Sequence, residues 1–491
     1  MKRLFLLIGL ALLALATVLV VRTLRIPAAP PAVADTGARM AVDEVAAANR
    51  LAGAIRFPTV SYASGGPIDT SAFLGLHQYL LDSFPLVHAN LSRELVNGLS
   101  LLYTWRGADS TLPPVVLMGH LDVVPVAESN LPEWKQPPFS GEVADGYVWG
   151  RGTLDDKTTV VSILEAVEGL LREGYRPPRT VYLTFGHDEE VSGRFGARAI
   201  VELLHSRGVR PALVLDEGGF MAKGVIPGLD GRTAIVGIAE KGYVSLRLRA
   251  KARGGHSSTP PGRTAIGALS RAVSTLEADQ FPSSLDGPTR GTIEAMAPYA
   301  PFTRRLVLAN LWLTKPIVMR VMRGTPLGAA LLHTTTAPTM LSAGIKDNVL
   351  PPEASAVVNF RIRPGETVAT VTDRVRSVIA DSMVIVEPLD SVGVDPSPIS
   401  DVHSPAYALI TETIRGMAPG ERIPVLPYLV MGGTDAKYWS SYTDRAFRFL
   451  AVPLGDGDLT RVHGVNERVG VADYATSVRF FARLLRGLDR L

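Results

Sequence analysis

The chain has 491 residues, of which 46% are hydrophobic and 20% charged, and its formal net charge is +3. This length exceeds what one hydrophobic core organises, so two domains, or one domain carrying an insertion, are expected. The composition is typical of a globular α/β protein and not of a disordered or fibrous one. No basic block with interleaved aromatic residues occurs, which argues against nucleic acid as a partner. Because the chain has no cysteine, any metal site has to be built from His and carboxylates.

The chain begins with an apolar run, Leu4 to Val21, that is long enough to cross a bilayer core of about 30 Å as a helix. Residues 1–25 are therefore predicted to be a membrane anchor or signal segment, and the Pro/Ala-rich residues 26–42 a linker. The length of the run, and Arg22 and Arg25 after it, favour an uncleaved anchor, while Ala32-Val33-Ala34 leaves cleavage and secretion open. Either alternative places the body of the protein outside the cytoplasm, in a periplasmic, extracellular or lumenal space.

Strands and helices alternate from about residue 43 onward. Buried strands are expected at 114–118, 180–185 and 212–215, and helices at 158–173 and 197–206. This βαβ order predicts an α/β fold with a mostly parallel mixed sheet flanked by helices, with ligands gathered at the strand ends.

The pattern changes near Gly242, where residues 244–249 alternate apolar and polar side chains as in an antiparallel strand with one wet face. The elements expected after it are a helix at 264–276, a strand at 356–362, a helix after Thr367 and a final amphipathic helix at 473–488. We therefore predict a main domain in two parts, 43–241 and 396–491, with a smaller α+β domain inserted at 242–395.

His and acidic residues stand at the predicted strand ends and in one glycine-rich turn. In Gly119-His120-Leu121-Asp122, the histidine and the aspartate are two residues apart, so both side chains lie on one side of an extended backbone. His120 can therefore bind a metal while Asp122 orients its ring. In the segment from Gly150 to Lys157, glycines allow a tight turn before Asp155, which is the candidate to bridge two ions.

Three further segments complete the set of possible ligands. In His187-Asp188-Glu189-Glu190, adjacent carboxylates point to different sides, so Glu190 can bind metal while Glu189 takes a proton from water and hands it to a leaving nitrogen. Asp216-Glu217 follows the next strand, and His463 lies near the C-terminus. Each segment alone is typical of solvated surface, but together these oxygen and nitrogen ligands suit two zinc ions, with Co²⁺ or Mn²⁺ as alternatives.

The order of these segments resembles the dizinc aminoacylase and carboxypeptidase family over about residues 45–490. Within it the chain is most similar to the branch of vacuolar carboxypeptidase S and the N-fatty-acyl amino acid synthase/hydrolases. The family uses either acid at the fourth segment, and Asp216 is preferred over Glu217 because it comes first after the strand. The ligands that the resemblance implies are His120, Asp155, Glu190, Asp216 and His463.

The same resemblance implies a substrate site. His256, in Gly254-Gly255-His256-Ser257-Ser258, would stabilise the oxyanion when the inserted domain closes as a lid. Asn348 would bind substrate, and Arg361 would grip a free carboxylate, with Arg363 as the competing candidate because strand alternation places both on one face. Backbone N–H groups of the loop at Gly432, Gly433 and Thr434 would meet that carboxylate, although such a loop can also be a plain turn.

The function implied is hydrolysis of the amide bond next to a C-terminal amino acid that carries a free carboxylate. The substrate is either a short peptide or an N-acyl amino acid, and a reversible N-fatty-acyl amino acid synthase/hydrolase is the alternative activity. A tethered binding protein that has lost catalysis would lack ligands or Glu189, and all are filled here. The membrane is an expected partner through the N-terminal segment, and the oligomeric state stays open.

One segment, Phe302 to Thr325, interleaves large apolar residues with Arg and Lys. It has two interpretations: helices of the second domain with their charges facing water, or a basic amphipathic element that touches lipid or receives an acyl chain.

Overall fold

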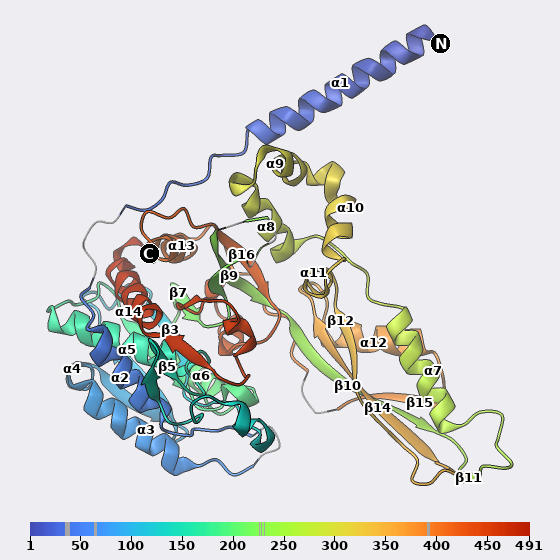
Figure 1. Ribbon diagram of the computed structural model, residues 1–491, viewed down its shortest axis with the longest axis horizontal. Coiled ribbons are helices and arrows are strands. Elements are labelled where there is room, and N and C mark those ends of the chain that lie inside the picture. Colours follow the sequence, from blue (N-terminus) through green and yellow to red (C-terminus); the bar gives the residue numbers. More distant parts are fainter. Residues whose placement is uncertain (35–39, 63–65, 225, 227, 230, 390–392) are drawn as a thin grey trace.

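The computed structural model describes residues 1–34, 40–62, 66–224, 226, 228–229, 231–389 and 393–491. Residues 35–39 of the predicted linker lie outside the described residues. One helix, α1 (Lys2–Leu24), projects from the body, and the body has a larger unit and a smaller, elongated one (Figure 1). In the part of the chain described, α1 is the one helix long and apolar enough to cross a membrane.

A ten-stranded mixed sheet forms the centre of the larger unit, in the order β1-β2-β6-β3-β7-β17-β9-β8-β18, with β16 paired to β9. Its middle strands, β6 (Val181–Gly186), β3 (Val115–His120), β7 (Leu213–Asp216) and β17 (Ala446–Arg448), run parallel. The predicted sheet is thus confirmed as a mixed sheet. The other strands are β1 (Ser92–Val96), β2 (Ser100–Trp105), β8 (Phe220–Lys223), β9 (Arg232–Glu240), β16 (Val425–Val430) and β18 (Pro453–Leu454).

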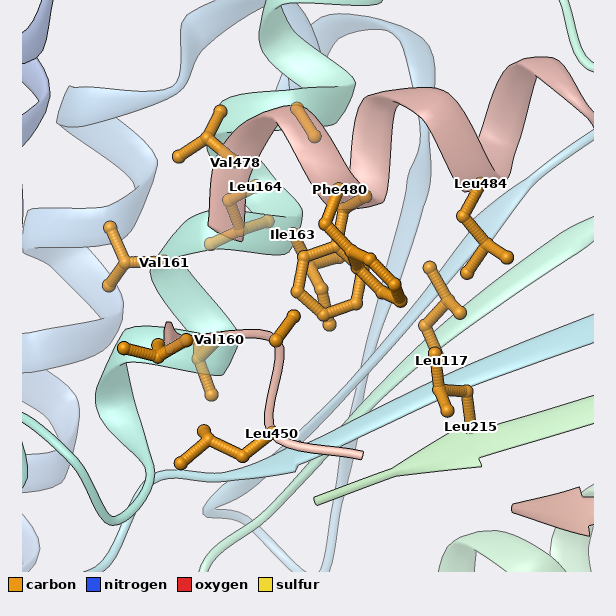
Figure 2. Packing of buried hydrophobic residues seen from close by; sticks show 14 of the residues in the cluster. Leu117, Val160, Val161, Ile163, Leu164, Leu215, Leu450, Val478, Phe480 and Leu484 are labelled. Carbon is orange, nitrogen blue, oxygen red and sulfur yellow. The ribbon is translucent and has the colours of Figure 1, made fainter. Parts of the chain in front are cut away.

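Helices cover both faces of this sheet because each presents an apolar stripe to it. Figure 2 shows Leu117 and Leu215 on the sheet facing Ile163, Phe480 and Leu484 of two helices, and all five side chains are buried. The other face is covered by the helix predicted at 197–206. The helices of this unit are α2 (Glu44–Ile55), α3 (Thr70–Ser83), α4 (Pro85–Asn90), α5 (Lys157–Arg172), α6 (Ala197–Ser206), α13 (Pro405–Arg415) and α14 (Val471–Arg486).

The smaller unit is an antiparallel sheet in the order β12-β14-β10-β15, with a separate apolar core. A short pair of strands stands at its far tip (Figure 1). Its core elements lie between residues 242 and 388, while the domain limits 242–395 stay a prediction. The elements are β10 (Gly242–Lys251), β11 (Gly255–His256), α7 (Ala265–Ala278), β12 (Thr335–Ala343), β13 (Val349–Leu350), β14 (Glu353–Ile362), α12 (Val368–Ile379) and β15 (Val384–Pro388).

A helical segment inside the predicted inserted domain does not join that core. α8 (Gly287–Met296) packs against β16 of the main sheet, where the Thr292 hydroxyl donates to the carbonyl of Pro427 at 2.6 Å. α9 (Phe302–Ala309), α10 (Leu311–Met322) and α11 (Pro326–Leu332) follow it, and the last turns of α1 lie against α9. A three-stranded sheet of β4 (Glu142–Ala144), β5 (Tyr147–Trp149) and β19 (Arg468–Gly470) completes the larger unit.

A buried ion pair lies where the chain passes from the main sheet to the smaller unit. Arg448 on β17 is 0% exposed, and its Nε donates to Glu240 Oε1 at 2.6 Å. The Thr434 hydroxyl donates to the same oxygen at 2.6 Å. Since Glu240 ends β9 two residues before β10 begins, this cluster anchors the junction between the two units.

Replacing Arg448 by Met is expected to destabilise the protein by roughly 3–5 kcal/mol, because it leaves the Glu240 carboxylate buried without its cation. The midpoint of chemical unfolding measures this loss. The double variant Arg448→Met, Glu240→Gln removes the uncompensated charge and should regain part of the stability. A double variant no more stable than the single one would show that the ion pair is not the cause.

Candidate metal centre

The carboxylate of Asp155 lies between two imidazoles. His120 ends β3, and its Nε2 lies 2.9 Å from Asp155 Oδ1. His463 comes from a loop more than 300 residues further along the chain, and its Nε2 lies 2.9 Å from Asp155 Oδ2. One carboxylate therefore offers one oxygen to each side, which is the arrangement that a ligand bridging two cations needs.

Further carboxylates extend this cluster on both sides. Glu190 Oε2 lies 3.2 Å from His463 Nε2, and Glu190 Oε1 is buried with no hydrogen-bond partner among the described residues. Potential ligand atoms of His120, Asp155 and Glu190 lie within 4.8 Å of one another, and so do those of His120, Glu189 and Glu217. An unpartnered buried carboxylate oxygen in a nitrogen and oxygen donor set fits a pair of divalent cations.

The position after β7 favours Glu217 over Asp216, the residue preferred from the sequence. Neither group of possible ligands found among the described residues includes Asp216. Its carboxylate instead accepts the backbone N–H of Ala436 at 2.6 Å. Adjacent residues at a strand end point to opposite sides, so only one of the two acids can face the centre. Sequence order alone could not decide which.

Asp122 holds three parts of the centre in place. Its buried carboxylate accepts the backbone N–H of Glu189 at Oδ1 and that of Glu190 at Oδ2, each at 3.1 Å. Its Oδ1 also lies 3.3 Å from Nδ1 of His120, and its backbone carbonyl lies 2.9 Å from the same ring nitrogen. The expected contact with the ring is present, and the two backbone contacts add a role in aiming the Glu189-Glu190 turn.

Arg151 and Glu467 connect the Asp155 turn to the His463 loop, a role that sequence reasoning missed. The fully buried Glu467 accepts N–H groups of Leu154 at 2.7 Å and Asp155 at 3.2 Å, and it pairs with Arg151 at 2.5 Å. Arg151 also donates to the carbonyl of His463 at 3.0 Å. Both residues stand in segments singled out from the sequence, but nothing in their spacing indicated that they pair.

The cluster shifts the ionisation of its members strongly. Asp155 and Glu190 accept from His463 and raise its pKa to about 10. Although burial opposes it, the donating imidazoles of His120 and His463 hold the pKa of Asp155 below its usual range. Burial raises the pKa of Glu189 well above its ordinary value. Such concentrated negative charge next to a base is typical of a metal-binding catalytic site.

Two of the residues assigned to substrate lie together at the tip of the smaller unit. His256 on β11 pairs with Val349 on β13, and the N–H of Ser257 donates to the carbonyl of Asn348 at 3.1 Å. His256 is exposed, and its Nδ1 accepts the N–H of Ser258 at 3.1 Å. Figure 1 shows this tip far from the main sheet, so His256 is not brought to the metal ligands in this arrangement.

The two candidate arginines on β14 differ in their partners. Arg363 forms an ion pair with Asp286. Arg361 stacks on Tyr243, with its guanidinium carbon 4.9 Å from the ring centroid, and the described residues give its guanidinium no hydrogen-bond or ionic partner. Its guanidinium is therefore the one available for a ligand carboxylate.

In the loop after β16, some residues have open space beside them and one has its side chain bound to another residue. Gly432 and Gly433 are exposed and have open space around them. Thr434 is buried, and its hydroxyl is committed to Glu240. Only its backbone is left for the binding role expected from the sequence.

Comparison with known proteins identifies the family. The model of peptidase family M20/M25/M40 matches residues 116–487. The chain is a member of this family. It is accordingly a hydrolase of the metallopeptidase type, as the sequence resemblance implied.

Similar proteins fall into two groups by name. The chain is 42% identical to the N-fatty-acyl-amino acid synthase/hydrolase of Mus musculus, covering 91% of this chain and 88% of that one. It is 31% identical to carboxypeptidase S of Saccharomyces cerevisiae, covering 88% and 82%. Both branches named from the sequence are thus represented.

Solved structures confirm the fold. An M20 family metallo-carboxypeptidase from Sulfolobus solfataricus superposes with a TM-score of 0.65 at 17% identity, covering 92% of this chain and 100% of that one. A dinuclear metal-binding M20 peptidase from Bacillus subtilis has a TM-score of 0.56 at 14% identity, covering 91% and 100%.

Removing the Asp122 carboxylate should weaken metal binding and activity roughly 10- to 100-fold, because the N–H groups of the Glu189-Glu190 turn lose their acceptor and the His120 ring keeps only the backbone carbonyl of residue 122. Metal content and activity of Asp122→Ala measure this. Asp69→Ala, which removes an exposed helix cap outside the ligand cluster, is the control. Full metal content in Asp122→Ala would contradict the positioning role.

Loading metal into the metal-free protein at pH 7 should release about one proton from His463, since its raised pKa keeps it protonated there and a ligand imidazole must be neutral. Metal affinity should accordingly rise with pH. Calorimetry in buffers of different ionisation enthalpy counts the protons. His463→Ala should release about one fewer, and an unchanged count would remove His463 from the ligand set.

Proposed function

We propose that the protein hydrolyses the amide bond between an acyl group and an amino acid with a free carboxylate, and that it uses two metal ions. Zinc is the metal that we favour. The observation that carries this is the Asp155 carboxylate shared between His120 and His463, with Glu189 and Glu190 beside it. The proposed ligands are His120, Asp155 and Glu217 on one side, and Asp155, Glu190 and His463 on the other. Glu217 replaces Asp216 for the reason given above.

When bound, two such ions lower the pKa of water and polarise a carbonyl. Glu189 is the proposed proton carrier. Its N–H is held by Asp122, which leaves its carboxylate facing the cluster with His120 and Glu217. The raised pKa of Glu189 suits a group that accepts a proton from water and then delivers it to the leaving nitrogen.

Substrate recognition rests on a cation and on a lid movement. Arg361 binds the free carboxylate through its planar guanidinium, together with N–H groups at Gly432 and Gly433. His256 and Asn348 reach the same substrate when the smaller unit closes over the main sheet. Closure has to move the β11-β13 tip across the gap between the units, while the Glu240–Arg448 pair keeps the junction in place.

For the substrate class we favour N-fatty-acyl amino acids, supported by the likeness to the synthase/hydrolases at up to 42% identity. The reverse reaction, amide formation, uses the same residues. The second candidate is a short peptide, supported by the likeness to carboxypeptidase S. Activity of the metal-loaded chain against dipeptides and N-acyl amino acids of increasing chain length decides between them.

We also propose that α1 is retained as a membrane anchor with the body outside the cytoplasm. Its support is a 23-residue apolar helix that is exposed along almost its whole length. Such a surface is costly in water and stable in a bilayer.

Glu189→Gln should lower kcat roughly 10²- to 10⁴-fold while keeping both metals, because it removes a proton carrier and no ligand. Glu190→Gln is the matched comparison, in which metal content itself should fall. Metal analysis together with turnover separates the two. Native turnover in Glu189→Gln would remove Glu189 from the mechanism.

Arg361→Ala should raise KM roughly 10- to 100-fold for substrates with a free carboxylate, since one charge-assisted contact is lost. Substrates whose carboxylate is amidated should bind the variant and the native protein equally poorly. Arg363→Ala, which breaks a pair with Asp286, is the control and should leave KM near its native value. If KM instead rose in Arg363→Ala and stayed near its native value in Arg361→Ala, Arg363 would be the residue that binds the substrate carboxylate.

A further inference from the structure

The helical segment α9–α10 leaves its apolar side chains unburied. None of the residues of α9 is buried, and α10 buries only Leu311 and Val318. A helix of a soluble domain normally covers its apolar stripe by packing it on a core. These two helices pack on α8, α11 and α1, and their outer side remains uncovered in the part of the chain described.

The uncovered side of α10 is a regular stripe. Leu313, Ile317 and Val321 follow one another at a spacing of four, so they lie on one face, and they are 43%, 60% and 71% exposed. Trp312 at the start of the helix is 57% exposed. We call these four residues the α10 stripe. Contiguous exposed side chains of this size mark a contact surface.

The charges around the α10 stripe are of one sign. No Asp or Glu stands between Glu294 and Asp347, whereas the same stretch holds Arg and Lys. Arg320 and Arg323 are exposed beside the stripe and have no carboxylate partner among the described residues. An apolar face edged by unpaired cations is complementary to a bilayer surface with anionic headgroups.

The corner between α9 and α10 is joined to the end of α1. Asn310 is 0% exposed, and its side-chain N–H donates to the carbonyl of Leu19 at 3.2 Å and lies 3.4 Å from the Thr23 hydroxyl. Figure 1 shows α1 leaving the body at α9, with α10 running on from α9 across the direction of α1. Helices that lie along a membrane surface run across the axis of a spanning helix, as α10 does relative to α1 in this view.

From these four observations we propose that the α10 stripe inserts into the membrane surface and docks the body against the bilayer. This rests on the proposed anchoring by α1. The helix α10 is an interfacial element. Its α10 stripe lies in the headgroup boundary, and Arg320 and Arg323 lie among the anionic headgroups. The body is then held by two contacts and has a fixed orientation, where a lone anchor followed by a linker would leave it free to tumble.

Because the chain has no cysteine, single cysteines can report on each contact in the full-length protein. Ile317→Cys and Val321→Cys test the α10 stripe. Leu12→Cys reports on α1, and Leu74→Cys, on the exposed face of α3, is the aqueous control. Each variant is labelled with a nitroxide and reconstituted in vesicles of phosphatidylcholine and phosphatidylglycerol. Collisions with O₂, which concentrates in the bilayer, and with a water-soluble nickel chelate are then compared.

The proposal expects the O₂ to nickel ratio at 317 and 321 to exceed that at 74 several-fold and to lie below that at 12, because 12 is near the middle of the spanning helix and α10 lies at the bilayer surface. If 317 and 321 match 74 while 12 is in the bilayer, docking is overturned and the anchor stands. Shielding of 317 and 321 from both reagents would mean a second copy or another protein on the α10 stripe, and also overturns docking. An aqueous label at 12 would overturn the anchor and docking together.

Discussion

The chemistry proposed for this protein depends on one carboxylate shared between two imidazoles. Asp155 offers each of its oxygens to a different ring, and those rings come from residues 120 and 463. Such a concentration of ionisable groups is unfavourable unless opposite charge is present, because carboxylates that share a site raise one another's pKa. The burial of Glu189, Glu190 and Glu217 around this point is stable when cations occupy it, so the fold has to supply rigid supports that keep the acids together before metal arrives.

Those supports are buried polar groups one step away from the ligands. Asp122 holds the turn that carries Glu189 and Glu190, and Glu467 holds the turn that carries Asp155. Arg151 then ties that turn to the His463 loop. Asp122 and Glu467 accept backbone N–H groups, and Arg151 donates to a backbone carbonyl. The supports therefore fix the path of the chain and leave the ligand side chains free to adapt to the ions. Their loss should therefore affect metal affinity more than the overall fold.

The sequence predicted the elements near the centre well, because buried strands followed by polar residues have a local signature. The strand before His120, the strand before Glu189 and the helix after Asp155 all formed within a residue or two of their expected bounds. The sequence could not decide between Asp216 and Glu217, because the choice depends on which face of the strand end meets the cluster. Long-range partners such as Arg151 with Glu467, and Glu240 with Arg448, have no local signature at all. The packing of α8 on the main sheet was missed for the same reason.

The separation of the two units bears on the proposed docking at the membrane. His256 and Asn348 stand at the tip of the smaller unit, and the Glu240–Arg448 cluster anchors the junction about which that unit would move. The segment α9–α10 leaves the smaller sheet but packs, through α8, on β16 of the main sheet. Docking through α10 would therefore fix the main sheet and its metal centre relative to the bilayer, and the lid would be left to move. A substrate with a long acyl chain and a charged head would place its acyl chain in the bilayer. Such an arrangement keeps the groups that bind its carboxylate in water, close to the bilayer surface.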